Sequence, residues 1–383
     1  MAEVRKEHKV TATPPHVIGF VFNPGRLDRL AACRRGEAPS EFFYGAIELA
    51  ARGLDIRFFE IDPATPVHWP CAVFNFLGQN GPVKLDGIFL QATGNLLNQL
   101  NDCDVVVGIT GHAFALAVWR SLGRLRAPIV AIQGGLLNHK INFLRRHSTV
   151  FSLRRMESML YGDSELEPMY KTFPGIRGHM HVNQFGVDAS FWTPGRASES
   201  GYILAVGNDG RRDYPTLIEA ARSLPWRVIL ITACELPTLP SNVEHIHGGY
   251  AGGVSDAKLR DLYRGASCVV VPLKPTFQPS GQSVTLQAMA CGRPVVLTET
   301  QGIWSRETVR DRETLLLTPP GDAGQLVQAI RWVMENNEFA GNLGIAARDA
   351  VLRSATIQAF ADRLLNICHL ASVNKGQTRW QQT

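Results

Sequence analysis

The chain has 383 residues, 45% of them hydrophobic, and its 39 Lys and Arg exceed its 34 Asp and Glu for a formal net charge of +5. This length exceeds what one hydrophobic core usually supports, and no apolar run reaches the roughly 18 residues of a membrane-spanning helix, so we expect two domains and no membrane span. The N-terminus is charged where a signal peptide needs an apolar core, and the seven cysteines are scattered without a Cys-x-x-Cys pair. We therefore expect a cytoplasmic protein in a reducing compartment.

In the first half of the chain, short apolar segments alternate with helical ones. Strands are predicted at residues 16–22, 56–61, 104–109 and 129–132. Ser40 is expected to cap a helix that ends at Gly53, and a further helix is predicted over residues 115–125. This alternation is typical of a parallel sheet with helices on its faces, as in a Rossmann-like domain.

A segment rich in Gly, Ser and Pro, residues 185–201, has no periodic apolar pattern and is interpreted as a hinge between two domains. The same rhythm restarts after it, with strands predicted at residues 202–206, 227–232, 243–247 and 269–271. Pro215 falls in the first turn of one predicted helix, and Ser255 can cap another. The fold class is therefore predicted as α/β with two Rossmann-like halves.

The sequence from Ser280 to Gly292, SGQSVTLQAMACG, has the form of an anion-binding turn. Small residues stand where a helix must begin, and Gly292 suits the left-handed conformation that ends it. The N–H groups of a first helical turn lack partners within the helix and carry partial positive charge, so phosphate is the expected ligand. The loops after Val206 and His247 would share the same carboxyl edge of the sheet. An ordinary strand–turn–helix unit without a ligand has the same pattern.

No acidic residue occurs between Asp104 and Glu157, although the interval carries many cations. They are Arg120, Arg124, Arg126, Lys140, Arg145, Arg146, Arg154 and Arg155. Such a face suits an anionic phospholipid surface, a phosphate-bearing acceptor or nucleic acid, and solvated helix faces of this composition are also common. Nucleic acid is not expected, because no recognition motif and little interleaving of aromatics accompany the charges. Peripheral contact with the inner face of a membrane, a phosphate-bearing acceptor and a plain solvated face all stay open.

Four segments, in this order along the chain, together resemble glycosyltransferase family 4. They are NQFGVDASFWTP (183–194), AVGNDGRRDYPTLIEA (205–220), LRDLYRGASCVVVPL (259–273) and SGQSVTLQAMACGRPVVLTETQG (280–302). The resemblance implies the GT-B fold, in which two Rossmann-like domains face each other across a cleft. It also implies an acceptor domain at 1–190, a nucleotide-sugar donor domain at 191–355, and a C-terminal helix at about 356–372 that packs back on the first domain.

The chain departs from this family where chemistry is usually assigned. The family carries two glutamates eight residues apart, and Pro279 and Gln287 stand at those positions. The Gln287 amide can still hydrogen-bond ribose hydroxyls, whereas Pro279 has no polar side chain, so sugar contacts must come from Gln278, Gln282 or backbone N–H groups. In the first donor loop Asn208 stands where an arginine is usual. In the same loop Arg212 matches the family's lysine and Arg211 precedes it. In the first half of the chain Gly134 stands where the family has a histidine, and His112 is the substitute candidate.

Glycosyl transfer from a nucleotide sugar builds negative charge on the departing diphosphate, so preset cations and N–H donors lower the barrier. No metal or cofactor is then expected, because the nucleotide sugar is a co-substrate. The side chains expected to act on the leaving group or the acceptor are Arg212, Arg211, Lys274 and His112. Those expected to bind the donor are Gly207, Asn208, Tyr250, Gln278, Ser280, Gly281, Gln282, Ser283, Gln287 and Glu299. The acceptor is expected beside Asn23, Gly25 and Arg26.

These features predict a glycosyltransferase that moves a sugar from a nucleotide-diphosphate sugar to a glycan or lipid-linked acceptor. The resemblance implies retention of the anomeric configuration and a place in polysaccharide or glycolipid biosynthesis. Two alternatives stay open. One is a nucleotide-sugar epimerase or an inverting transferase on the same fold, and the other is a non-catalytic partner subunit, which the absent glutamate pair motivates.

Overall fold

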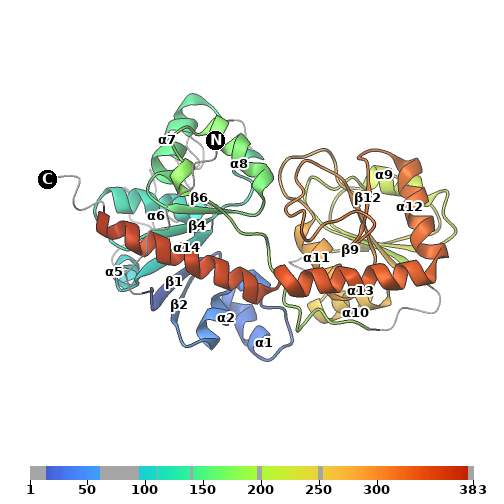
Figure 1. Cartoon of the computed structure of the whole chain (residues 1–383), viewed down its shortest axis with the longest axis horizontal. Helices are drawn as coiled ribbons and strands as arrows, with labels where there is room; N and C mark the ends of the chain where they lie inside the picture. The colour runs from blue at the N-terminus through green and yellow to red at the C-terminus, as the bar shows by residue number, and fades with distance from the viewer. Residues whose placement is uncertain are drawn as a thin grey trace.

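The computed structural model describes residues 14–60, 95–109, 111–138, 141–195, 201–248 and 253–377. Two parallel six-stranded sheets, each flanked by helices, follow one another along the long axis of the molecule (Figure 1). The predicted α/β class with two parallel sheets is confirmed. The domain limits at residues 190 and 355 stay a prediction.

The first sheet has the strand order β2-β1-β3-β4-β5-β6, and all neighbouring strands are parallel. Its strands are β1 (Val17–Phe22), β2 (Asp55–Glu60), β3 (Val105–Ile109), β4 (Ile129–Ile132), β5 (Glu157–Leu160) and β6 (Met180–Val182). Its helices are α1 (Leu30–Arg34), α2 (Ala46–Ala51), α5 (Asn95–Asn101), α6 (Gly111–Ser121), α7 (Phe143–Leu153) and α8 (Leu166–Thr172). The central strands are apolar throughout because helices bury both faces of the sheet.

The second sheet has the order β12-β11-β10-β7-β8-β9 and is also parallel. Its strands are β7 (Ile203–Val206), β8 (Val228–Thr232), β9 (Val243–His247), β10 (Cys268–Val271), β11 (Val295–Thr298) and β12 (Leu316–Thr318). Its helices are α9 (Tyr214–Ala221), α10 (Asp256–Gly265), α11 (Gln282–Ala290), α12 (Ala323–Glu335) and α13 (Asn337–Ser354). Each predicted strand that the structure describes begins within one residue of its predicted start.

The predicted start of the helix, with its cap at Ser40, is wrong, whereas the predicted later turns form α2. Tyr44 and Gly45 both adopt left-handed backbone conformations, with φ of 53° and 81°, so the chain breaks between a short 3-10 turn (Glu41–Phe43) and α2. The Ser40 hydroxyl caps no helix and instead hydrogen-bonds the buried carboxylates of Glu48 and Asp188. The helix predicted at 115–125 is present but lies earlier in the chain, as α6.

The last two helices run in sequence across both halves of the molecule (Figure 1). Helix α13 packs against α11 of the second half, and α14 (Ile357–Gln377) packs on the first sheet through Phe360, Leu364 and Ile367. α14 approaches α2 so closely that a Cβ on Gly45 would lie 2.8 Å from the Ala361 Cβ. No helix among the described residues is both long and apolar enough to cross a membrane.

Gly45→Ala is expected to lower the free energy of unfolding by about 2–4 kcal/mol. The left-handed backbone costs an alanine about 1 kcal/mol, and the clash with Ala361 adds about 1–3 kcal/mol of overpacking. Gly53→Ala is the matched control, because Gly53 has a φ of 90° and open space around its Cα. Urea unfolding of both variants measures the difference, and equal losses would contradict the close approach of α14.

Candidate active site

Arg212 is the most deeply buried cation at the carboxyl edge of the second sheet, with 5% of its surface exposed. It follows β7, and its guanidinium lies between the Cα atoms of Gly207 and Gly281, where added Cβ atoms would collide with it. Gly281 has a φ of 70° and directly precedes α11, whose first turn no side chain caps. The Arg212 Nη1 atom is buried and has no hydrogen-bond partner. A guanidinium therefore sits beside the free N-terminus of a helix, which suits a phosphate.

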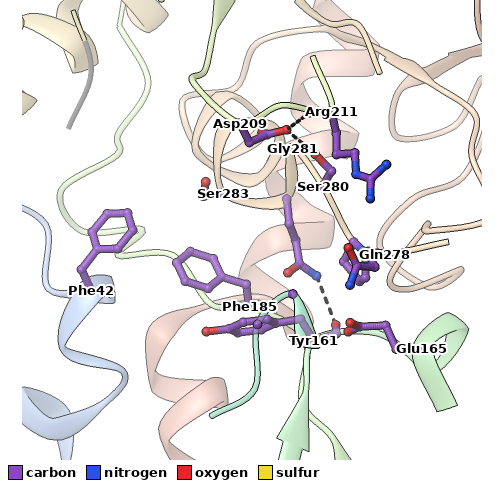
Figure 2. Close-up of a pocket in the computed structure, with 14 residues that line it drawn as sticks. Phe42, Tyr161, Glu165, Phe185, Asp209, Arg211, Gln278, Ser280, Gly281 and Ser283 are labelled. Carbon is purple, nitrogen blue, oxygen red and sulfur yellow. Dashed lines mark hydrogen bonds between the residues drawn. The ribbon is translucent and has the colours of Figure 1, made fainter. Parts of the chain in front are cut away.

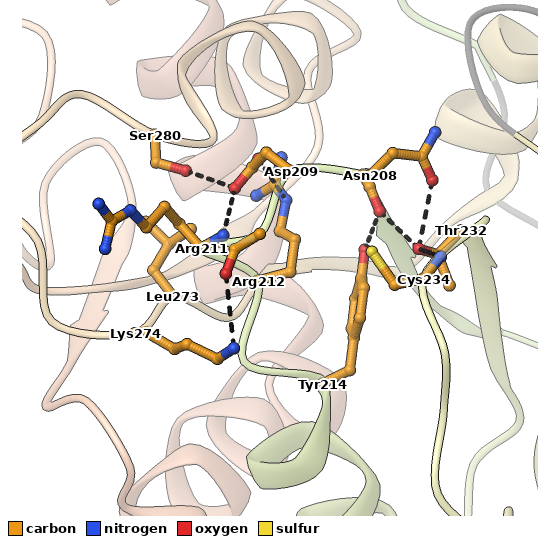
Figure 3. Close-up of polar contacts among 12 residues, drawn as sticks. Asn208, Asp209, Arg211, Arg212, Tyr214, Thr232, Cys234, Leu273, Lys274 and Ser280 are labelled. Atoms are coloured by element: carbon orange, nitrogen blue, oxygen red, sulfur yellow. Dashed lines mark hydrogen bonds and ion pairs between the residues drawn. The ribbon is translucent and has the colours of Figure 1, made fainter. Parts of the chain in front are cut away.

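The cations Arg211, Arg212 and Lys274 lie close together and are called the cationic loop below. Asp209 holds this cationic loop together (Figure 3). One carboxylate oxygen lies 3.0 Å from the Arg212 Nε, and the other accepts hydrogen bonds from the Arg211 N–H at 2.9 Å and the Ser280 hydroxyl at 3.0 Å. Lys274 completes the loop, because its N–H and its ammonium donate to the carbonyls of Arg211 and Gly210. The structure thus brings together four of the predicted residues, Arg211, Arg212, Lys274 and Ser280, around a carboxylate that the sequence did not single out.

A cavity of about 270 Å³ opens beside this loop within the second half of the molecule. Apolar side chains of Val206, Ile231 and Val254 line it, together with Gly207 and Gln287. The Asn208 side chain also faces it, although its oxygen accepts from the Ala233 N–H at 2.5 Å and from the Thr232 hydroxyl at 3.3 Å. These contacts tie the β7 loop to the β8 loop, and the expected donor contact of Asn208 stays a prediction.

Gln287 is held by the protein itself. Its Nε2 donates to the Glu41 Oε1 at 2.7 Å, and its Oε1 accepts from the Tyr263 hydroxyl at 3.3 Å. Glu41 comes from the first half of the chain, is fully buried, and also accepts from the Trp192 Nε1 and the Asp188 N–H. Gln287 therefore links the two halves in this conformation, and its predicted contact with ribose stays a prediction.

A second cavity, of about 280 Å³, lies between the two halves and shares Asp209 and Ser283 with the first (Figure 2). From the first half it is lined by Phe42, Gly134, Gly135, Tyr161 and Glu165. From the second half it is lined by Arg211 and the segment 278–283, which includes the predicted Gln278, Ser280, Gly281, Gln282 and Ser283. The cationic loop therefore lies where the two cavities meet.

The predicted acceptor-side residues lie at the carboxyl end of β1. His112 approaches Asn23, with 2.5 Å between the His112 Nε2 and the Asn23 Oδ1. The Arg26 guanidinium lies over the Phe42 ring, 5.8 Å from its centroid, and Phe42 lines the cavity between the two halves. Gly25 has a φ of 79° and forms the turn between them. Asn23, Gly25 and His112 do not line that cavity, and their roles stay predictions.

Two further predicted donor residues fall elsewhere. Glu299 lines neither cavity, and its carboxylate lies 3.6 Å from the Arg306 Nη1 in a separate surface pocket. Tyr250 lies outside the described residues, as do Gly249 and Gly252 of the same loop. Within the described ranges, no group of three or more His, Cys, Asp or Glu side chains is arranged to hold a metal ion. Independence from metals and cofactors stays a prediction.

Residues 202–336 match the family model described as glycosyl transferases group 1. Among solved structures, a sucrose-phosphate synthase from Thermosynechococcus elongatus is 17% identical with a TM-score of 0.68, covering 92% of this chain and 98% of that one. A glycosyltransferase from Rickettsia africae is 12% identical with a TM-score of 0.66, covering 93% and 98%.

A third solved structure, HepE from Anabaena in complex with UDP-glucose, is 15% identical with a TM-score of 0.62, covering 91% of this chain and 98% of that one. No curated protein sequence is matched. At these identities the solved structures show the fold, which is GT-B. The family match places a region similar to group 1 glycosyltransferases on the second half, where the cationic loop lies, and supports a glycosyltransferase.

Gln287→Glu is expected to destabilise the fold by about 3 kcal/mol at high pH, because it would place a second carboxylate against buried Glu41. Burial raises the pKa of Glu41 to about 8, although hydrogen bonds from Asp188, Gln287 and Trp192 lower it. Ionising Glu41 therefore disfavours folding, and its share of stability is complete below about pH 4.5 and lost as the pH rises through about 8. With two carboxylates this loss becomes steeper.

The swapped double variant, Glu41→Gln with Gln287→Glu, keeps one carboxylate and one amide in the pair. It is expected to recover most of the stability that Gln287→Glu loses. Unfolding free energies at pH 6 and pH 8.5 for the wild type, both single variants and the double variant give the coupling energy. Losses in the two single variants that simply add in the double variant would show that the pair does not interact.

Proposed function

We propose that the protein is a glycosyltransferase that moves a sugar from a nucleotide-diphosphate sugar to a glycan or lipid-linked acceptor. One observation carries the proposal: the buried guanidinium of Arg212, with its Nη1 lacking a partner, lies at the start of α11 where the two cavities meet. Negative charge develops on the departing diphosphate during transfer, and a preset cation beside free helix N–H groups stabilises it.

The two cavities divide the donor between them in this proposal. The nucleoside enters the cavity lined by Val206, Ile231 and Val254, and the sugar enters the cavity between the two halves. The diphosphate then lies at Arg212 and Ser283, and it takes the place of the Asp209 carboxylate on the cations. HepE, which shares the fold, was solved with UDP-glucose, and this supports a nucleotide-sugar donor. Retention of the anomeric configuration and independence from metals belong to the same proposal.

Arg212→Gln is expected to abolish the rise in melting temperature that a nucleoside diphosphate produces in the wild type. It is also expected to reduce kcat by about 10²–10³-fold, as loss of one preset donor to a developing negative charge does. UDP, GDP, ADP and TDP form the panel for the thermal shift. The control is Arg222→Gln, because Arg222 is an exposed arginine that directly follows α9 and pairs with Glu219, and this variant should leave both readouts unchanged.

Product analysis separates this proposal from its alternatives. Transfer or slow hydrolysis of the matching nucleotide sugar indicates a transferase, and an isomerised sugar would instead indicate an epimerase. A wild-type protein that responds to none of the four nucleotides would favour the non-catalytic partner subunit. An Arg212→Gln variant with wild-type turnover would remove the arginine from the mechanism.

The surface of α7 supports the lipid-linked class of acceptor. Phe143 is 73% exposed, Leu144 and Phe151 are also exposed, and Arg146 and Arg155 stand among them. The Arg155 guanidinium lies 3.5 Å from the centroid of the Phe151 ring, so charge and apolar surface are interleaved. Apolar side chains surrounded by arginines suit the interface of an anionic bilayer. We propose that α7 rests on the inner face of the membrane; Lys140 of the basic interval lies outside the described residues.

Phe143→Ser with Leu144→Ser is expected to reduce binding to vesicles that contain anionic phospholipid by about tenfold, because two exposed apolar side chains are lost. Co-sedimentation with anionic and with purely zwitterionic vesicles is the measurement. Ile345→Ser is the control, because Ile345 is 64% exposed on α13 in the other half. Equal binding to both kinds of vesicle, or an equal effect of the control, would argue against a membrane role for α7.

A further inference from the structure

Pro279 leaves the second half of the molecule without a side chain that can bind sugar hydroxyls at this position. The structure shows what lies against it. A Cβ on Gly162 would be 2.8 Å from the Pro279 Cγ, so the loop that follows β5 packs directly on this proline. That loop, from Tyr161 to Glu165, also lines the cavity between the two halves. The loop Tyr161–Glu165 of the first half therefore occupies the space beside Pro279.

Two polar side chains face this cavity from opposite halves (Figure 2). Glu165, at the end of the 3-10 turn Asp163–Glu165, is 5% exposed. Gln278 is 6% exposed, and its Nε2 is buried without a hydrogen-bond partner. A buried amide donor costs free energy when it is unpaired, so it marks a place where a ligand is expected to supply an acceptor. The carboxylate supplies the complementary acceptor for hydroxyl donors.

We propose that Glu165 and Gln278 form a subsite that binds hydroxyl groups of the sugar being transferred, and that Glu165 supplies from the first half the carboxylate that is absent at Pro279. The inference rests on the proposed function, because the sugar must reach this cavity from a nucleotide held at Arg212. It names residues on both sides of the cleft, so the subsite is complete only when the two halves are closed on each other.

The protonation of Glu165 fits such a role. Burial raises the pKa of its carboxyl group to about 7, although backbone hydrogen bonds from Tyr161 and Gly162 lower it. Near neutral pH the group can therefore accept a hydrogen bond from one hydroxyl or donate one to another. The Tyr161 carbonyl accepts a hydrogen bond from the Gln282 Nε2 at 3.3 Å, which fixes this loop against the start of α11.

The experiment compares binding of a nucleoside diphosphate with binding of the corresponding nucleotide sugar by calorimetry. The probes are UDP with UDP-glucose, ADP with ADP-glucose, TDP with TDP-glucose and GDP with GDP-mannose. The wild type is expected to bind one nucleotide sugar more tightly than its nucleoside diphosphate. Glu165→Ala is expected to lower the affinity for that nucleotide sugar by about 10- to 100-fold, the range for loss of a hydrogen bond to a charged group. Its affinity for the nucleoside diphosphate is expected to stay within about twofold of the wild type.

Two further variants separate sugar binding from folding. Glu165→Gln keeps an acceptor for the backbone N–H groups of Tyr161 and Gly162, and should show a smaller loss of sugar affinity at an unchanged melting temperature. Glu167→Gln is the control, because Glu167 is an exposed glutamate of α8 that pairs with Arg177, and should match the wild type.

The outcomes are distinct for the two proposals. A wild type that binds no nucleotide would overturn the proposed function and the subsite with it. The subsite alone would be overturned if the wild type bound the nucleotide sugar no more tightly than the nucleoside diphosphate. It would also be overturned if Glu165→Ala kept the higher affinity for the nucleotide sugar. If Glu165→Ala lowered the affinities for the nucleoside diphosphate and the nucleotide sugar by the same factor, Glu165 would have a structural role and the subsite would also be overturned.

Discussion

The hydrogen bond between Glu41 and Gln287 is the contact on which the geometry of the cleft depends. It joins the two sheets through a fully buried carboxylate that also accepts from Trp192 and Asp188 of the connecting segment. A buried carboxyl group that accepts from three separate donors is costly to leave unpaired, so these hydrogen bonds favour this position of one half relative to the other. The cavity between the halves forms in that position, because its walls come from both of them, whereas the other cavity lies wholly within the second half.

In the proposed function, the cationic loop is arranged by the protein before a diphosphate binds. Asp209 neutralises Arg212 and bonds to the Ser280 hydroxyl, so these groups are already oriented toward one point (Figure 3). Gly207 and Gly281 allow the guanidinium to lie against backbone, which no larger residue would permit. A diphosphate carries more charge and more acceptor oxygens than one carboxylate, and it can therefore displace Asp209 while reusing an arrangement that is already built.

The sequence predicted most of the frame of this site and little of what crosses between its halves. The long apolar strands and the turn at Gly281 follow from local patterns, which act over a few residues. β5 was not predicted, because Glu157–Leu160 is short and carries polar side chains where a buried strand usually has none. Glu41, Asp209 and Glu165 have no local signature, since their roles arise from partners that are distant in the chain or from burial that only the folded structure creates.

Pro279 and Gln287, the two departures from the family that the chain resembles, have the same kind of neighbour. Each position where that family carries a glutamate, 279 and 287, lies in this structure beside a segment of the first half that brings a glutamate of its own. A glutamate at 287 would be disfavoured at high pH, because it would place a second carboxylate beside Glu41, which now accepts a hydrogen bond from the Gln287 amide at 2.7 Å. Pro279 packs on Gly162, so a longer side chain there would compete for space with the loop that carries Glu165. Residues 279 and 287 therefore both contact segments of the first half that carry glutamates, and in the proposed subsite the carboxylate that binds the sugar comes from the first half and not from the second.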